Sequence, residues 1–123
     1  MPEVRGGFLK ASYVASGNLS QYRFVNFSGV DVYLPPTSGS IVLGVTQNHP
    51  NDNEQAALVT LGHTRITLGG SLAAGAVVMT GLNGFATLAQ SGQFVGGYLV
   101  SAADSGLVAE MVFTPWRSFG GAP

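Results

Sequence analysis

The feature that most constrains this 123-residue chain is a segment that recurs 53 positions further along. Ser38-Gly39-x-Ile41-Val42-x-Gly44 returns as Ser91-Gly92-x-Phe94-Val95-x-Gly97. Further apolar pairs keep the same offset: Phe24 with Val77, Leu58 with Met111, and Val59 with Val112. A self-match at a fixed period indicates two copies of one supersecondary unit. We therefore expect a duplicated β domain over 21–114, with copies at about 21–61 and 75–114. The two copies should superpose and share one core.

Short apolar or alternating runs, separated by glycine, proline and asparagine, make up the repeated region. Such spacing is typical of a small sandwich or barrel, and no run has the length and period of an amphipathic helix. Expected strands cover 21–27, 30–34, 41–45, 55–61, 63–68, 76–80, 85–88, 94–100 and 107–113, with a bend at Gly62 and a polar loop over 48–53. The prediction is an all-β fold. Its core should include Val42, Leu58, Val95 and Met111.

The two ends of the chain fall outside the repeat. Residues 1–20 contain the breakers Gly6-Gly7 and Ser16-Gly17, so we expect an irregular, extended N-terminal arm there and a C-terminal tail over 115–123. Both segments nevertheless carry large apolar and basic side chains. The interface residues expected on them are Arg5, Phe8, Leu9, Lys10, Tyr13, Trp116, Arg117 and Phe119. The alternative is that these aromatic side chains fold back and cap the β core.

The charge content is low. Only 9% of the residues are charged, against about 25% in an ordinary soluble domain. With a net charge of −1 and 5 basic residues, the chain lacks the basic patch that binds nucleic acid. Because 46% of the residues are apolar and few charges keep the surface soluble, we expect protein partners to cover part of it.

The same composition excludes several other classes. The chain has no cysteine, so it has no disulfide and no thiolate nucleophile or metal ligand. No apolar run reaches the roughly 18–20 residues that span a bilayer, and the first residues lack the pattern of a signal peptide. We expect synthesis in a cytoplasm, with neither membrane nor nucleic acid as partner.

No pattern predicts catalysis or a bound cofactor. His49 and His63 could join Asp31, Asp52 or Asp104 and a serine in a triad, but no Gly-x-Ser-x-Gly sequence supports this. Asn51-Asp52-Asn53-Glu54 could offer oxygen ligands to calcium, yet it lacks the spacing of an EF-hand loop. We expect no catalytic residue, no metal site and no cofactor.

Several pieces of the chain carry a resemblance to a known family. They are Tyr22-Arg23-Phe24-Val25, Ile41-x-Leu43-Gly44-Val45-x-Gln47-Asn48, Gly62-His63-Thr64-Arg65-Ile66, Leu72-Ala73-Ala74-Gly75, and Gly97 followed by Ala102-Ala103. In this order they resemble the head decoration, or capsid cement, proteins of tailed bacteriophages, and more distantly the lambda-like decoration proteins. The loop over 48–54 is more polar than the family's small-residue loop.

The resemblance implies a structural virion protein without catalytic activity. Such a protein would bind the major capsid protein on the outer surface of the capsid, often as a homotrimer, and stabilise the shell. Two other classes stay open. A carbohydrate-binding module of a tail or fibre would use exposed aromatic side chains such as Tyr33, Tyr98 and Trp116, which do not share one strand. A small β-barrel enzyme would need polar groups that converge in one pocket.

Overall fold

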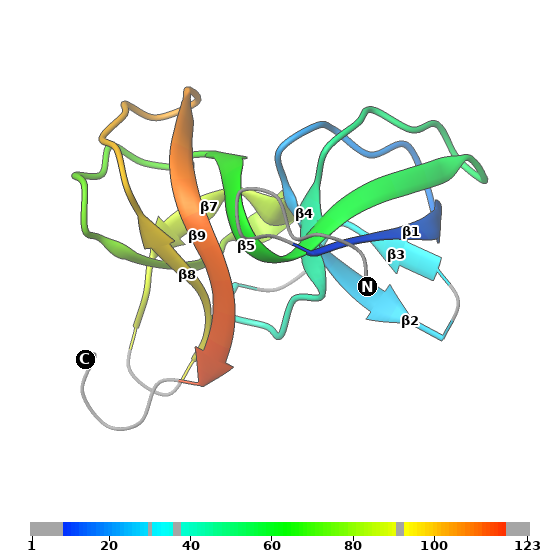
Figure 1. The fold of residues 1–123 in the computed structure, drawn as a ribbon, viewed down its shortest axis with the longest axis horizontal. Coiled ribbons are helices and arrows are strands. Elements are labelled where there is room, and N and C mark those ends of the chain that lie inside the picture. Colours follow the sequence, from blue (N-terminus) through cyan, green and yellow to red (C-terminus); the bar gives the residue numbers. More distant parts are fainter. Residues whose placement is uncertain (1–8, 30, 36–37, 91–92, 118–123) are drawn as a thin grey trace.

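The computed structural model describes residues 9–29, 31–35, 38–90 and 93–117, with only the backbone described for 9–10 and 115–117. The strands are β1 (Leu9–Ala15), β2 (Phe24–Ser28), β3 (Asp31–Tyr33), β4 (Gly44–Thr46), β5 (Gln55–Thr67), β6 (Val77–Thr80), β7 (Ala86–Leu88), β8 (Phe94–Leu99) and β9 (Val108–Arg117), with a 3-10 turn η2 (Leu82–Gly84). The all-β prediction is confirmed, and the strands form barrels rather than a sandwich (Figure 1).

The first half of the chain forms a closed five-stranded barrel, here called barrel one. Strand β1 runs parallel to β3, and antiparallel pairs then join β3 to β2, β2 to β4 and β4 to β5. The first half of β5 pairs back with β1, from Val14 opposite Gln55 to Leu9 opposite Leu61. This last pair closes the ring, so β1 has neighbours on both sides.

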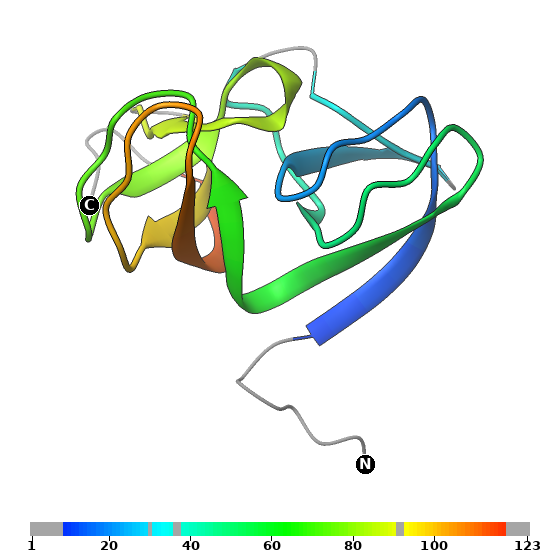
Figure 2. The ribbon, with the colours of Figure 1, turned by 90° about the horizontal axis from the view of Figure 1, so that it is seen from above.

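The second half repeats this order of strands and is here called barrel two. Its first strand is the second half of β5, which pairs with β9, while β9 pairs with β8, β8 with β6, and β6 with β7. A parallel bridge between Leu68 and Ala86 joins β5 to β7 and completes the ring. Strand β5 therefore belongs to both barrels, and Figure 2 shows it passing from one to the other.

Most of the pairings recur with the offset of 53 residues. Phe24 faces Val45 as Val77 faces Tyr98, Val45 faces Val59 as Tyr98 faces Val112, and Val14 faces Gln55 as Thr67 faces Val108. The β6–β7 pair departs from this rule: Met79 faces Thr87, whereas the offset from Asn26 and Tyr33 would give Ala86. The longer turn that contains η2 accounts for this one-residue shift.

The midpoint of β5 is Gly62, where the strand bends as the sequence predicts. Its φ of +113° lies in a region that side chains with a Cβ rarely adopt. Because the bend does not interrupt the strand, the two runs expected over 55–61 and 63–68 are one strand of 13 residues.

The core consists of two clusters of buried side chains, and the expectation of one shared core is wrong. The smaller cluster fills barrel one and contains Ala15, Leu19, Val25, Val32, Ala56 and Leu58. The larger one fills barrel two but takes Phe24, Val42 and Val45 from the first half. Closed rings enclose separate interiors, which is why the clusters are separate. Val42, Leu58, Val95 and Met111 are buried, as predicted.

The N-terminal arm expected over residues 1–20 is also wrong for residues 9–15. These residues form β1, in which Ala15 is fully buried and Tyr13 and Val14 are half-buried. Both sides of the strand are hydrogen-bonded, so the pairing overrides the glycine breakers that flank it. At the other end β9 continues to Arg117, three residues past the boundary expected at 114.

Candidate functional site

The outer face of barrel two carries a mixed apolar and polar surface across β8, β9 and β5. Tyr98 lies opposite Val112, which lies opposite His63, so these three side chains form one row across the sheet. Glu110 and Arg65 face each other in the next row. Apolar side chains beside them are exposed, namely Val100 and Val108. A face of this composition suits a wet protein contact.

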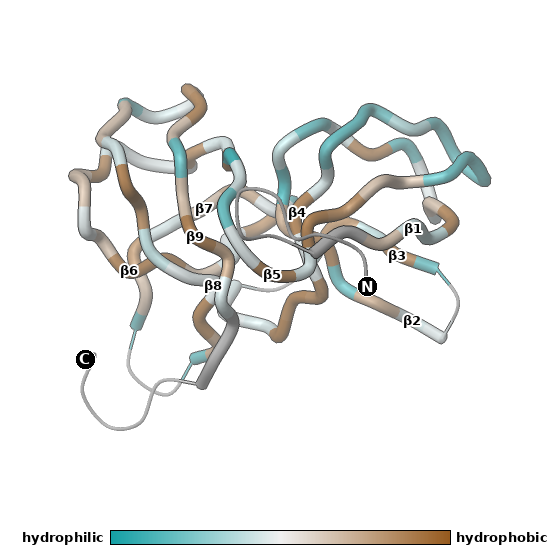
Figure 3. The backbone as a smooth tube through the Cα atoms, viewed as in Figure 1, coloured by the Kyte–Doolittle hydropathy of each residue, from teal (hydrophilic) through white to brown (hydrophobic). Residues whose placement is uncertain are grey.

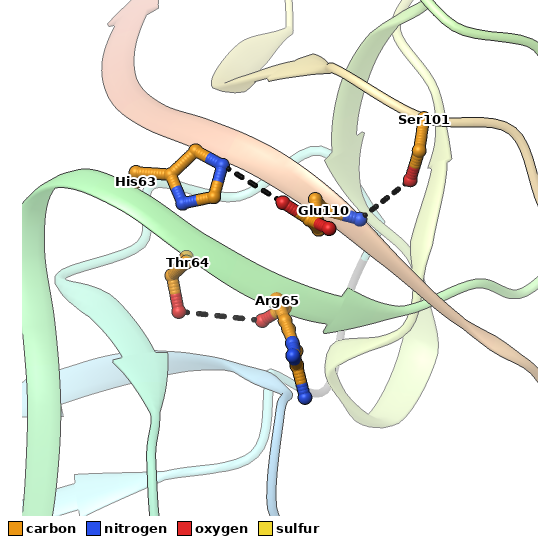
Figure 4. Close-up of polar contacts among 5 residues, drawn as sticks. All are labelled: His63, Thr64, Arg65, Ser101 and Glu110. Atoms are coloured by element: carbon orange, nitrogen blue, oxygen red, sulfur yellow. Dashed lines mark hydrogen bonds and ion pairs between the residues drawn. The ribbon is translucent and has the colours of Figure 1, made fainter. Parts of the chain in front are cut away.

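The polar groups of this face are held by one another (Figure 4). His63 Nε2 lies 3.1 Å from Glu110 Oε1, and the backbone N–H of Glu110 donates to Ser101 Oγ at 3.0 Å. Figure 4 shows that Arg65 points away from Glu110 despite its register. The His63–Glu110 pair is about half exposed, and an exposed pair contributes little to stability.

The two histidines lie in different barrels, so the structure does not bring them together. His49 lies in the loop before β5, where its Nδ1 is 3.1 Å from the carbonyl oxygen of Leu19. His63 lies on β5 in barrel two. The triad that the sequence leaves open could therefore use only one of them.

Polar loops close one end of barrel one (Figure 3). Asp52 Oδ1 accepts from the backbone N–H of Gly17 at 2.7 Å, and Glu54 Oε1 accepts from that of Asn51 at 2.8 Å. Asn18 Oδ1 accepts from the N–H of Asp52 at 2.9 Å. Asp52 of the possible calcium loop is thus tied to the loop that contains Gly17 and Asn18, whereas Glu54 closes a turn within its own loop. Within the described part of the chain, no three metal-ligating side chains lie together.

The equivalent end of barrel two is apolar by comparison. A shallow hollow of about 680 Å³ is lined there by Ser71, Leu72, Ala73, Ala102, Ala103, Asp104, Leu107 and Val108. Leu107 is 57% exposed at its rim. Figure 3 shows the contrast between the hydrophilic loops of barrel one and the more apolar loops of barrel two.

A second hollow, of about 310 Å³, opens on the side of barrel one. It is lined by Asn26, Phe27, Tyr33, Ile41, Val42 and Leu43. Two apolar side chains remain exposed there, Phe27 by 45% and Ile41 by 62%. The strand expected over 41–45 begins only at Gly44, so Ile41 precedes it, and the sequence does not predict this site. A signal for it was present in the sequence: the run 41–45 has apolar side chains on both faces, but only one face can pack against the core.

Arg23 crosses from barrel one to barrel two. Its guanidinium lies 3.9 Å from the centroid of the Phe85 ring, and Nη1 donates to the carbonyl oxygen of Asn83 at 3.2 Å. Burial lowers the pKa of Arg23 from its ordinary value, because desolvation disfavours the charged form. Phe24, the next residue, packs against Phe113 with ring centroids 6.1 Å apart. The two barrels are thus joined by packing as well as by β5.

The predicted interface residues are only partly placed by the structure. Tyr13 packs on the core of barrel one and meets Phe27 edge to face at 5.3 Å. The backbones of Leu9 and Lys10 lie in β1, and those of Trp116 and Arg117 lie in β9 opposite Val95 and Phe94. Arg5, Phe8 and Phe119 lie outside the described residues. That these eight side chains form one interface stays a prediction.

None of the helices that the structure describes is long and apolar enough to span a membrane.

Comparison with known proteins finds a likeness among solved structures. No family model and no curated protein matches the chain. Among solved structures, the N base of the head fiber gp8.5 of bacteriophage phi29 superposes with a TM-score of 0.72 at 18% identity. The match covers 87% of this chain and 94% of that one. At this identity it shows a common fold.

Proposed function

We propose that this chain is a structural protein of a phage virion that binds the outer surface of the capsid and stabilises the shell. The observation that carries the proposal is the match over 94% of the phi29 head-fiber base, a protein of a phage head. The ordered motifs that resemble decoration proteins support the same reading. In this function the chain acts by contact alone and is not an enzyme.

The exposed surfaces support a role in protein contacts. Nine large hydrophobic side chains in the described part of the chain are at least two-fifths exposed, among them Phe27, Ile41, Leu107 and Val108. These four side chains line the two hollows, and exposed apolar residues that gather in a patch, unlike scattered ones, mark interaction sites. The partners that we propose are the major capsid protein and further copies of this chain, with a homotrimer on the shell.

A second candidate function is the base of a head fibre. It is favoured by the similar structure, which is the N base of a head fiber rather than a cement protein. A base would attach at selected positions and carry a fibre, whereas a cement protein would cover equivalent positions over the whole shell and reinforce it.

The test is to mix the purified protein with phage heads that lack it and to sediment the heads. Saturable co-sedimentation is the expected result, and absence of binding would overturn both candidates. Heating the decorated heads then separates the two. A cement protein raises the temperature at which the heads release DNA, whereas a fibre base binds in few copies and leaves that temperature unchanged.

A further inference from the structure

Asn83 is the one asparagine of the sequence that a glycine follows. Asparagine is a thermally labile residue, and a following glycine has no side chain to shield its backbone nitrogen from reaction with the asparagine amide. Asn83 and Gly84 lie in η2, the turn between β6 and β7 of barrel two, and the Asn83 side chain is exposed to water. The conformation of this turn therefore controls whether the pair reacts.

The reaction in question is a ring closure within the chain. The backbone nitrogen of Gly84 loses its proton and attacks Cγ of Asn83, and the side-chain amide takes up that proton and leaves as ammonia. Water then opens the cyclic imide at either of its carbonyl groups. The product at position 83 is aspartate or isoaspartate, and in isoaspartate the main chain runs through Cβ.

The folded backbone keeps the two reacting atoms apart. Ring closure needs the Gly84 nitrogen on the same side of the Asn83 Cα–C bond as Cβ. Asn83 has a φ of 61° and a ψ of 21°, and at this ψ the nitrogen lies on the side away from Cβ. The N–H of Gly84 is itself weakly held, at 3.4 Å from the carbonyl oxygen of Gly81. The reaction therefore requires the peptide plane between Asn83 and Gly84 to turn through much of a half-circle.

Two hydrogen bonds to the first half of the chain oppose this rotation. Arg23 Nη1 donates to the carbonyl oxygen of Asn83 at 3.2 Å, and the N–H of Asn83 donates to the carbonyl oxygen of Pro35 at 3.0 Å. The Asn83 carbonyl turns with the bond that ring closure must rotate, so the reaction breaks the hydrogen bond to Arg23. The contact of the guanidinium with the Phe85 ring, at 3.9 Å, fixes Arg23 in turn.

The isoaspartate product does not fit this turn. Gly84 is buried, and a Cβ on it would collide with the backbone carbonyl oxygen of Phe24. Isoaspartate adds one carbon to the main chain immediately before this contact. The lengthened turn cannot keep Gly84 against Phe24 and also return the carbonyl of residue 83 to Arg23.

We propose that Asn83 is a deamidation site that the contact with Arg23 keeps nearly inactive in the folded protein. When η2 leaves Arg23, the peptide can rotate and the ring closes. Isoaspartate at position 83 then prevents the turn from docking again. Deamidation of Asn83 therefore accumulates with each opening of the junction between the barrels. This inference does not depend on the proposed function.

The experiment compares Arg23→Ala with the matched control Arg65→Ala, which removes an exposed arginine of β5. Each protein is incubated in mildly alkaline buffer, and peptide mass spectrometry follows the loss of the amide at residue 83. We expect Arg23→Ala to react at least about fivefold faster than the wild type, because loss of its contacts raises the population of the open turn by such a factor. Arg65→Ala should react within about twofold of the wild type. Equal rates in Arg23→Ala and the wild type, or equal acceleration in both variants, would overturn the proposal.

A second measurement separates opening of the turn from unfolding of the whole chain, and it needs only the wild type. The deamidation rate is measured at several urea concentrations below the unfolding midpoint. Opening of one turn exposes little surface, so its population changes little with urea, whereas the unfolded population rises steeply. We expect a rate that changes by less than about twofold over this range. A rate that rises in proportion to the unfolded population would overturn the proposal.

Discussion

Replacing Phe24 with alanine should destabilise both barrels at once. Phe24 lies on β2 of barrel one, yet its fully buried ring belongs to the core cluster of barrel two and packs on Phe113. The fit is close, because a Cβ on Gly96 would come within 2.5 Å of this ring. Truncation of a buried phenylalanine costs about 3–5 kcal/mol. For a chain of 123 residues this lowers the melting temperature by roughly 10–20 °C.

Urea and thermal unfolding followed by circular dichroism measure this effect. The matched control is Phe27→Ala, which should cost less than about 1 kcal/mol because that side chain is 45% exposed. We expect one cooperative transition for the wild type and for Phe24→Ala. A loss below about 1 kcal/mol in Phe24→Ala, or two separate transitions in which barrel two keeps its stability, would refute the view that the barrels are packed as one unit.

Three further predictions follow from the fold. Deleting residues 2–8 should leave the melting temperature within a few degrees of the wild type. Deleting residues 2–16 removes β1 and should abolish folding, as measured by circular dichroism. Equal stability of the two deletion variants would contradict the closed ring. Val95→Asp places an unpaired charge at a fully buried position and should leave no folded protein, so a cooperative melt near that of the wild type would refute the core assignment. Arg23→Ala should lower the free energy of unfolding in urea by about 1–2 kcal/mol, because it loses the contact with Phe85 and the hydrogen bond to Asn83. Arg23→Lys should keep only part of this free energy, since lysine lacks the planar guanidinium. Full stability of Arg23→Ala would show that this contact does not stabilise the fold.

Much of the fold could be predicted from the pattern of apolar residues and breakers. The breakers predict the strands that glycine or proline bounds to within a few residues, and a glycine inside a strand pattern predicts the bend at Gly62. Burial of Leu58 and Met111 followed from their match at the repeat offset. These features are local, or they depend on one offset that the sequence displays directly.

Strand β1 was missed because its evidence is not local. Leu9, Ala11 and Tyr13 do alternate with Lys10 and Ser12, but the run is short and glycines flank it. Strand β1 pairs with β5 in the same way as Gly62–Thr67, which lie 53 residues later, pair with β9. The two segments nevertheless have hardly any residue types in common. Backbone pairing defines this equivalence, and backbone hydrogen bonds leave little trace in side-chain identity.

The hollow beside Phe27 and Ile41 could not be predicted for a related reason. The repeat aligns Ile41 with Phe94 and predicts similar surroundings for both. The difference arises from Gly39, which bridges Phe94 to Thr80 across the junction of the barrels and has no counterpart beside Ile41 among the described residues. The asymmetry appears only when the two barrels are placed together.

The most direct test of the central claim is a cryo-electron microscopy map of phage heads saturated with this protein. We expect double-barrel density on the outer surface of the shell. Heads without additional density would contradict the claim that the protein binds the capsid.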